Sequence, residues 1–176
     1  ATALVGAEAA ALAYKSINCS MKKIASQEKK DYLQENLIIT NALEKKFLKL
    51  ADEDEMAYNQ VVKAYKEKDN AKIIKALINA TAIPLRVAWS NYELLLLLDR
   101  IHSKINNNFL PEFMSAAELA YAGLRSSIYP AEANIKSLEE LRQETWTAEA
   151  EISHLKLEAY NLMMGIQKQV YPQKEK

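Results

Sequence analysis

The scarcity of chain-breaking residues most restricts the fold that this chain can adopt. Only three glycines and four prolines occur among its 176 residues. Alanine, leucine, lysine and glutamate are abundant instead, and these residues have high intrinsic preferences for the α-helix. We therefore expect few turns and long helices, and the sequence predicts an all-α fold.

The chain is long enough for one domain with a substantial core, since a domain of about this size buries roughly 70% of the surface that its unfolded chain exposes. We predict a single helical domain over residues 1–176, a bundle of about five long helices. One of them should be kinked at Pro84, because proline removes a backbone donor. The expected helices are Thr2–Ile24, Lys30–Glu67, Asp69–Ile105, a fourth with Pro111 in its first turn and Pro130 at its end, and a last one that starts after Ser137, where "SLEE" matches a capping box.

The balance of charge argues against polyanionic partners. Lysine plus arginine equal aspartate plus glutamate at 23 each, so no net field attracts nucleic acid or an anionic membrane surface. The apolar opening "ATALVGAEAAALAY" carries Glu8 and is shorter than the roughly 20 residues that span a bilayer. Cys19 is the only cysteine, which excludes an internal disulfide and fits a reducing compartment. We expect a cytoplasmic protein with no nucleic-acid or membrane partner.

A carboxylate lies on the apolar stripe of the second predicted helix. In "FLKLADEDEMAYNQVVKAY", helical spacing places Asp54 on the same face as Phe47, Tyr58, Val61 and Tyr65, while its three acidic neighbours can point at water. A buried, unpaired carboxylate is expensive. Asp54 must therefore have partners, or the face that it shares must line a site that is not dry.

Both histidines follow an acid by three residues, as Asp99 with His102 and Glu151 with His154. This spacing occurs in carboxylate-bridged di-iron sites, which need such a motif from each of two helices and further glutamates. Glu151 and His154 fall beside the apolar stripe of the last helix and are expected to face solvent. We therefore expect solvated charge here, and no metal site.

A second inward acid, Glu112, lies in the first turn of the fourth predicted helix, where the macrodipole favours an ionised carboxylate. Glu112 either only complements the dipole or takes part in function. Periodicity leaves both possibilities open.

Several stretches of the chain resemble one family when they are taken in order. "ALVGAEAAALA" (3–13), "LADEDEMAYNQVVKAY" (50–65), "ATAIPLRVA" (80–88) and "ANIKSL" (133–138) resemble the cyclodeaminase/cyclohydrolase family. This family comprises the C-terminal half of formiminotransferase-cyclodeaminase and related methenyltetrahydrofolate cyclohydrolases. The resemblance implies a helical bundle that forms homodimers, with a tetrahydrofolate derivative bound near subunit interfaces.

The resemblance also assigns individual residues. Asp54 matches the family acid before "AY", and Asn134 matches the asparagine before the last helix. The sequence departs from the family pattern in three places. A glycine-rich "GGGS" entry has no counterpart here, and Pro111-Glu112 stands where the family has Ser-Asp. Pro130 replaces a family asparagine. The family carboxylate is thus kept one methylene longer, while the serine hydroxyl is lost.

The function that this resemblance implies is folate one-carbon chemistry of the formiminotetrahydrofolate cyclodeaminase or methenyltetrahydrofolate cyclohydrolase type. Proton transfer by carboxylates suffices for either reaction, so no metal or prosthetic group is expected and the tetrahydrofolate derivative is the substrate. The residues expected to act are Asp54 and Glu112 in proton transfer, Asn134 and Tyr58 in substrate binding, and Arg86 and Arg125 beside the glutamyl tail.

The alternative is a relative that kept the bundle and lost the chemistry. Such a protein would act as a folate-binding or protein-interaction module, because a fold can be conserved after its catalytic site has been lost.

Overall fold

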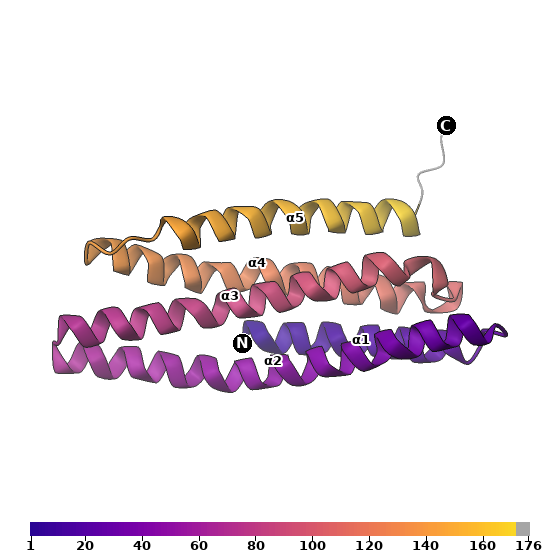
Figure 1. Cartoon of the computed structure of the whole chain (residues 1–176), viewed down its shortest axis with the longest axis horizontal. Helices are drawn as coiled ribbons and strands as arrows, with labels where there is room; N and C mark the ends of the chain where they lie inside the picture. The colour runs from indigo at the N-terminus through magenta and orange to yellow at the C-terminus, as the bar shows by residue number, and fades with distance from the viewer. Residues whose placement is uncertain (172–176) are drawn as a thin grey trace.

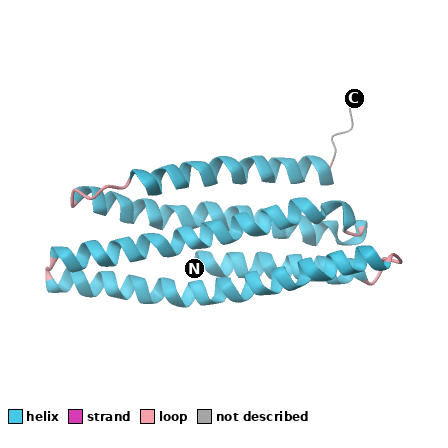
Figure 2. Ribbon diagram, in the orientation of Figure 1, coloured by secondary structure: helices cyan, strands magenta, loops and turns pink. Residues whose placement is uncertain are grey.

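The structure, a computed structural model, describes residues 1–171, and every regular element in that range is helical. Five long helices account for most of it (Figures 1 and 2), which confirms the predicted all-α fold. Two short 3₁₀ segments, η1 (His102–Lys104) and η2 (Asn107–Phe109), join α3 to α4. The long helices are α1 (Thr2–Met21), α2 (Gln27–Glu67), α3 (Asn70–Ile101), α4 (Leu110–Glu140) and α5 (Trp146–Val170).

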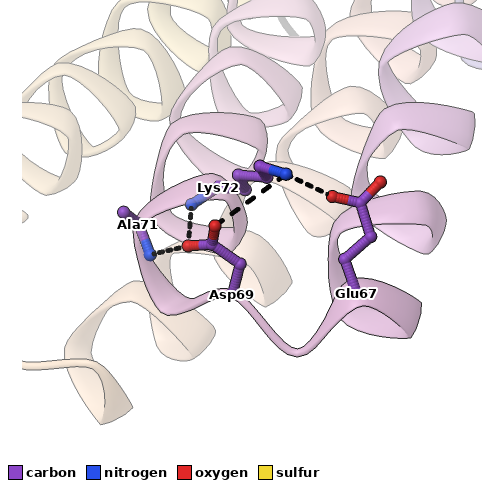
Figure 3. Close-up of polar contacts among 4 residues, drawn as sticks. All are labelled: Glu67, Asp69, Ala71 and Lys72. Carbon is purple, nitrogen blue, oxygen red and sulfur yellow. Dashed lines mark hydrogen bonds and ion pairs between the residues drawn. The ribbon is translucent and has the colours of Figure 1, made fainter.

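The turn between α2 and α3 shows how the sequence ends one helix and begins the next. Lys68 adopts a left-handed conformation with φ of 56°, which stops α2. The Asp69 carboxylate then accepts hydrogen bonds from the backbone N–H groups of Ala71 and Lys72, as Figure 3 shows. The Lys72 ammonium also pairs with Glu67 at 2.6 Å and so ties the two helix ends together.

Helices α1 to α4 form an antiparallel bundle, and α5 lies outside it along α3 and α4 (Figure 1). Buried alanines on α1, among them Ala9, Ala10 and Ala13, let α2 and α4 approach closely. The leucine run of α3 is buried on more than one side, with Leu96 exposed. The α5 helix supplies the additional cover, with Leu155, Ala159 and Met163 fully buried.

Helix α1 covers only part of the bundle. It has 20 residues, whereas α2 has 41. At 1.5 Å per residue, α2 is about 30 Å longer than α1. Figure 1 shows the start of α1 near the middle of α2, so the C-terminal half of α2 packs on α3 without α1 beside it.

Some predicted boundaries are wrong. Helix α4 continues through Pro130 to Glu140, because Pro130 is exposed and water can replace the backbone hydrogen bond that it removes. Ser137 is not a helix cap: it lies inside α4, where its hydroxyl donates to the Ala133 carbonyl. The last helix begins at Trp146 instead. Helix α3 runs through Pro84 as one helix, and the kink expected there stays a prediction. Helices α1 and α3 end at Met21 and Ile101, and α2 begins at Gln27, all within a few residues of expectation.

The acid–histidine motif on α5 also differs from expectation. His154 is exposed, but Glu151 is half-buried and accepts a hydrogen bond from the Trp89 indole N–H of α3. The prediction that Glu151 faces solvent is therefore wrong, because this residue lies where α5 packs on α3. Within residues 1–171 no three metal-binding side chains converge. No helix in this range is long and apolar enough to cross a membrane.

Candidate functional site

A cavity of about 650 Å³ opens beside residues 51–61 of α2, next to Ala1 and Leu4. Helices α2 and α4 form its walls, with Ala80 of α3 between them. The lining residues are Ala1, Leu4, Ala51, Asp52, Asp54, Glu55, Tyr58, Val61, Ala80, Pro130 and Asn134.

Asp54 lies on this cavity because the stripe of α2 continues beyond the start of α1. Before that point the stripe is buried, and Phe47 and Leu50 are at most 1% exposed. Beyond it, Asp54 and Val61 are half-buried, and Tyr58 and Tyr65 are exposed. The second of the two sequence-based alternatives thus holds: the face that Asp54 shares with its apolar neighbours is not dry.

Carboxylates dominate the electrostatics of the cavity. Asp54 is flanked at the rim by the exposed side chains of Asp52 and Glu55, which also line it. Of the described residues in the lining, none is a lysine, arginine or histidine. Such a cavity favours a cationic group or a ligand end rich in N–H donors.

Asn134 reaches the same cavity from α4. Its Nδ2 atom donates a hydrogen bond to the Ala80 carbonyl oxygen of α3 at 2.9 Å. The structure thus brings together Asp54, Tyr58 and Asn134, three of the predicted site residues, from helices that are distant in sequence.

Arg86 lies beside the site rather than in its lining. Its guanidinium pairs with Glu53 at 2.6 Å, and Lys49 lies 3.6 Å from the same carboxylate. Glu53 was expected to point at water, but it is half-buried by these contacts. Half of the Arg86 side chain remains exposed. Because Glu53 adjoins Asp54, this cation is near the acidic rim.

Glu112 lies at the opposite end of α4. It is 22 residues from Asn134, or about 33 Å along the helix. There it pairs with Lys15 of α1 at 3.2 Å, and its own backbone N–H together with Lys15 lowers the pKa of the Glu112 carboxyl. Asp54 and Glu112 therefore do not meet within one chain, although both residues are half-buried.

Arg125 is also remote from the cavity. It lies on the α4–α5 side, in a separate groove with Tyr121, Tyr129 and Tyr160. Its guanidinium is 5.7 Å from the centre of the Tyr121 ring, within cation–π range.

Sequence analysis missed the rim residues Asp52 and Glu55, which it assigned to solvent, as well as Ala80 and the start of α1. Helical periodicity gives no signal for these residues, because it does not fix which residues of different helices lie at the same level along the bundle.

Comparison with known proteins identifies the family and the fold of the chain. Residues 1–152 match the family model described as formiminotransferase-cyclodeaminase. The fold is similar to the crystal structure of formiminotetrahydrofolate cyclodeaminase from Thermotoga maritima, with a TM-score of 0.87 and 23% sequence identity. That match covers 96% of this chain and 84% of the other chain. A comparison with curated proteins found no match.

Proposed function

Because the chain belongs to the formiminotransferase-cyclodeaminase family, we propose that it closes the one-carbon unit of formiminotetrahydrofolate by carboxylate acid/base chemistry. The observation that carries the proposal is the shared cavity of Asp54 and Asn134. These are the two residues that the family resemblance singled out, and they come from separate helices. The start of α1 and Tyr58 complete the enclosure.

The proposed reaction needs one proton to be moved between two nitrogens. In the protonated formimino group, the N10 amine of the folate attacks the formimino carbon, and an N–C bond forms. N10 then loses its proton, and the departing nitrogen gains one. The C–N bond to that nitrogen breaks, ammonia leaves, and the ring closes as a methenyl cation. The net change is formiminium to methenyl cation plus ammonia.

Asp54 can serve both proton transfers. Its carboxylate takes the proton from N10 and returns it to the leaving nitrogen, which lies on the same carbon. One carboxylate thus suffices, and the proposal does not depend on Glu112. Both the formiminium group and the product are cations, and the acidic lining of Asp52, Asp54 and Glu55 would stabilise them.

The glutamyl tail of the folate would leave the cavity past the acidic rim. Arg86, beside Glu53, is the nearer of the two arginines proposed for it. Arg125 could reach a tail only from another chain or along the far side of α4. A cytoplasmic homodimer, as the resemblance implies, completes the proposal.

The test is the absorbance change on conversion of formimino- and methenyltetrahydrofolate by the wild-type chain and its Asp54→Asn variant. Loss of at least about 100-fold in turnover is expected for Asp54→Asn, the typical contribution of general acid–base catalysis. Asp31→Asn is the matched control: it neutralises a carboxylate near the other end of α2, where Asp31 accepts a hydrogen bond from Gln27. Equal turnover in all three proteins would refute the proposal.

The runner-up is a folate-binding module without turnover. Two observations favour it: Pro130, which stands where the family has an asparagine, lines the cavity, and the amide nitrogen of Asn134 is already engaged by Ala80. Calorimetric heat with tetrahydrofolate but no turnover from the wild-type chain would establish this alternative. Neither heat nor turnover would indicate an interaction module.

A further inference from the structure

The amide of Asn134 has one orientation, which a carbonyl in the neighbouring helix imposes. In an α-helix without proline, the carbonyl of residue 80 accepts a hydrogen bond from the backbone N–H of residue 84. Pro84 of α3 has no N–H, so the Ala80 carbonyl lacks this partner. Asn134 of α4 donates its Nδ2–H to this carbonyl instead, at 2.9 Å. Because a carbonyl oxygen only accepts, the amide nitrogen rather than the amide oxygen must face Ala80.

The same contact decides what Asn134 can offer a ligand. Its Oδ1 accepts no hydrogen bond from the described residues, and it is not among their buried unpaired atoms. Since Asn134 lines the cavity, this oxygen remains available there as an acceptor. The side chain therefore resembles the Asp54 carboxylate in hydrogen-bonding character, although it carries no charge.

We propose that Pro84 is a positioning residue for this site, and that Asn134, held by the orphaned Ala80 carbonyl, accepts a hydrogen bond from an N–H group of the ligand. The inference rests on the proposed function and specifies which end of the ligand enters. Asp54 and Asn134 both present acceptors, so the end that bears N–H donors lies between α2 and α4. The carboxylate end of the ligand stays outside.

Pro84 lies outside the lining and can act only through another residue. Pro84→Ala supplies a backbone N–H that competes with Asn134 for the Ala80 carbonyl, which frees the amide to rotate. The Pro84→Ala variant therefore separates a positioning role of Pro84 from a purely structural one. In this variant α3 gains a backbone hydrogen bond, whereas Asn134 loses its fixed orientation.

The first measurement uses the free protein and needs no ligand. In ¹⁵N NMR spectra, the side-chain NH₂ of Asn134 should be protected from solvent exchange in the wild-type chain and unprotected in Pro84→Ala. Asn36 is the internal control, because its Nδ2 donates to the Tyr32 carbonyl within α2. Its signal should not change. Equal protection of Asn134 in both proteins would overturn the inferred contact.

The second measurement is the dissociation constant of tetrahydrofolate, kept reduced, by calorimetry. Pro84→Ala and Asn134→Ala should each weaken binding by about three- to tenfold, the ordinary worth of one hydrogen bond. In the Asn134→Ala background, Pro84→Ala should have no further effect. An equal further loss in that background would overturn the positioning role. No binding by the wild-type chain would overturn the proposed function and the ligand role together, while the NMR signal decides the contact separately.

Discussion

Phe47 sets the distance between α1 and α2 next to the cavity, and substitution of Gly6 tests this. A Cβ atom built on Gly6 would lie 2.4, 2.6 and 2.7 Å from three atoms of the Phe47 ring. The ring is fully buried, so it cannot turn aside into solvent. Restoring an ordinary contact requires a movement of roughly 1 Å by the ring or by α1, and overpacking of this kind costs about 1 to 3 kcal/mol.

The expected effect follows from two opposing terms. Alanine is favoured over glycine inside a helix by about 1 kcal/mol. For a clash with three ring atoms we take the upper part of the steric range, about 3 kcal/mol. Gly6→Ala should therefore lower the free energy of unfolding by about 2 kcal/mol.

The chain supplies its own matched control in Gly165 of α5. A Cβ atom there would meet nothing within 4 Å, so only the propensity term acts. Gly165→Ala should raise the free energy of unfolding by about 1 kcal/mol. The two variants then differ by about 3 kcal/mol, or about 6 to 12 °C in Tm for a chain of this size.

Urea denaturation followed by circular dichroism measures both variants, and Phe47→Leu tests the assigned cause. In the Gly6→Ala background, Phe47→Leu should cost less than it does alone, because the smaller side chain leaves space for the new methyl group. A Gly6→Ala variant as stable as Gly165→Ala, or strict additivity with Phe47→Leu, would refute this packing argument.

Two further predictions concern contacts between helices. The lowered pKa of Glu112 means that its charged form stabilises the fold above its ordinary value of 4.5, and that this contribution is lost as the pH falls through the lowered pKa. Lys15→Met should raise the Glu112 pKa only partly in an NMR titration, since the backbone N–H remains; an unchanged pKa would contradict the pairing. Glu151→Ala removes the acceptor of the Trp89 indole N–H and should lower the free energy of unfolding in urea by about 1 kcal/mol. No change would mean that water replaces the carboxylate fully.

The sequence predicted the five long helices well, but it predicted the end of α4 poorly, for a physical reason. Helix α4 ends with Arg142 in the left-handed conformation at φ of 58°, and Gln143 and Arg142 donate to the carbonyls of Leu138 and Glu139. This is a Schellman ending, in which glycine is usual. An arginine at that position gives no sequence signal. Pro130 and "SLEE" supplied misleading signals nearby.

The sequence predicted which face of a helix a candidate site residue occupies, but not the level of that residue along the bundle axis. Helical periodicity fixes which face a residue occupies, and it placed Asp54 on the stripe of α2 that lines the cavity. It does not fix which residues of different helices lie at the same level along the bundle. That depends on the lengths and pairing of α1, α2 and α4, and these lengths separate Glu112 from the cavity.

The level of Asp54 along the bundle axis also explains how a carboxylate can lie on the apolar stripe of α2 without a paired charge. On the buried part of the stripe, Phe47 packs against Gly6 of α1. Further along the same stripe, Asp54 is half-buried and lines a cavity that is open to solvent. The carboxylate thus keeps access to water and to a ligand, and the stripe still packs on either side of it. A proton-transferring group needs both conditions, a fixed position and an accessible site, and a half-buried position on α2 at the wall of a cavity provides them together.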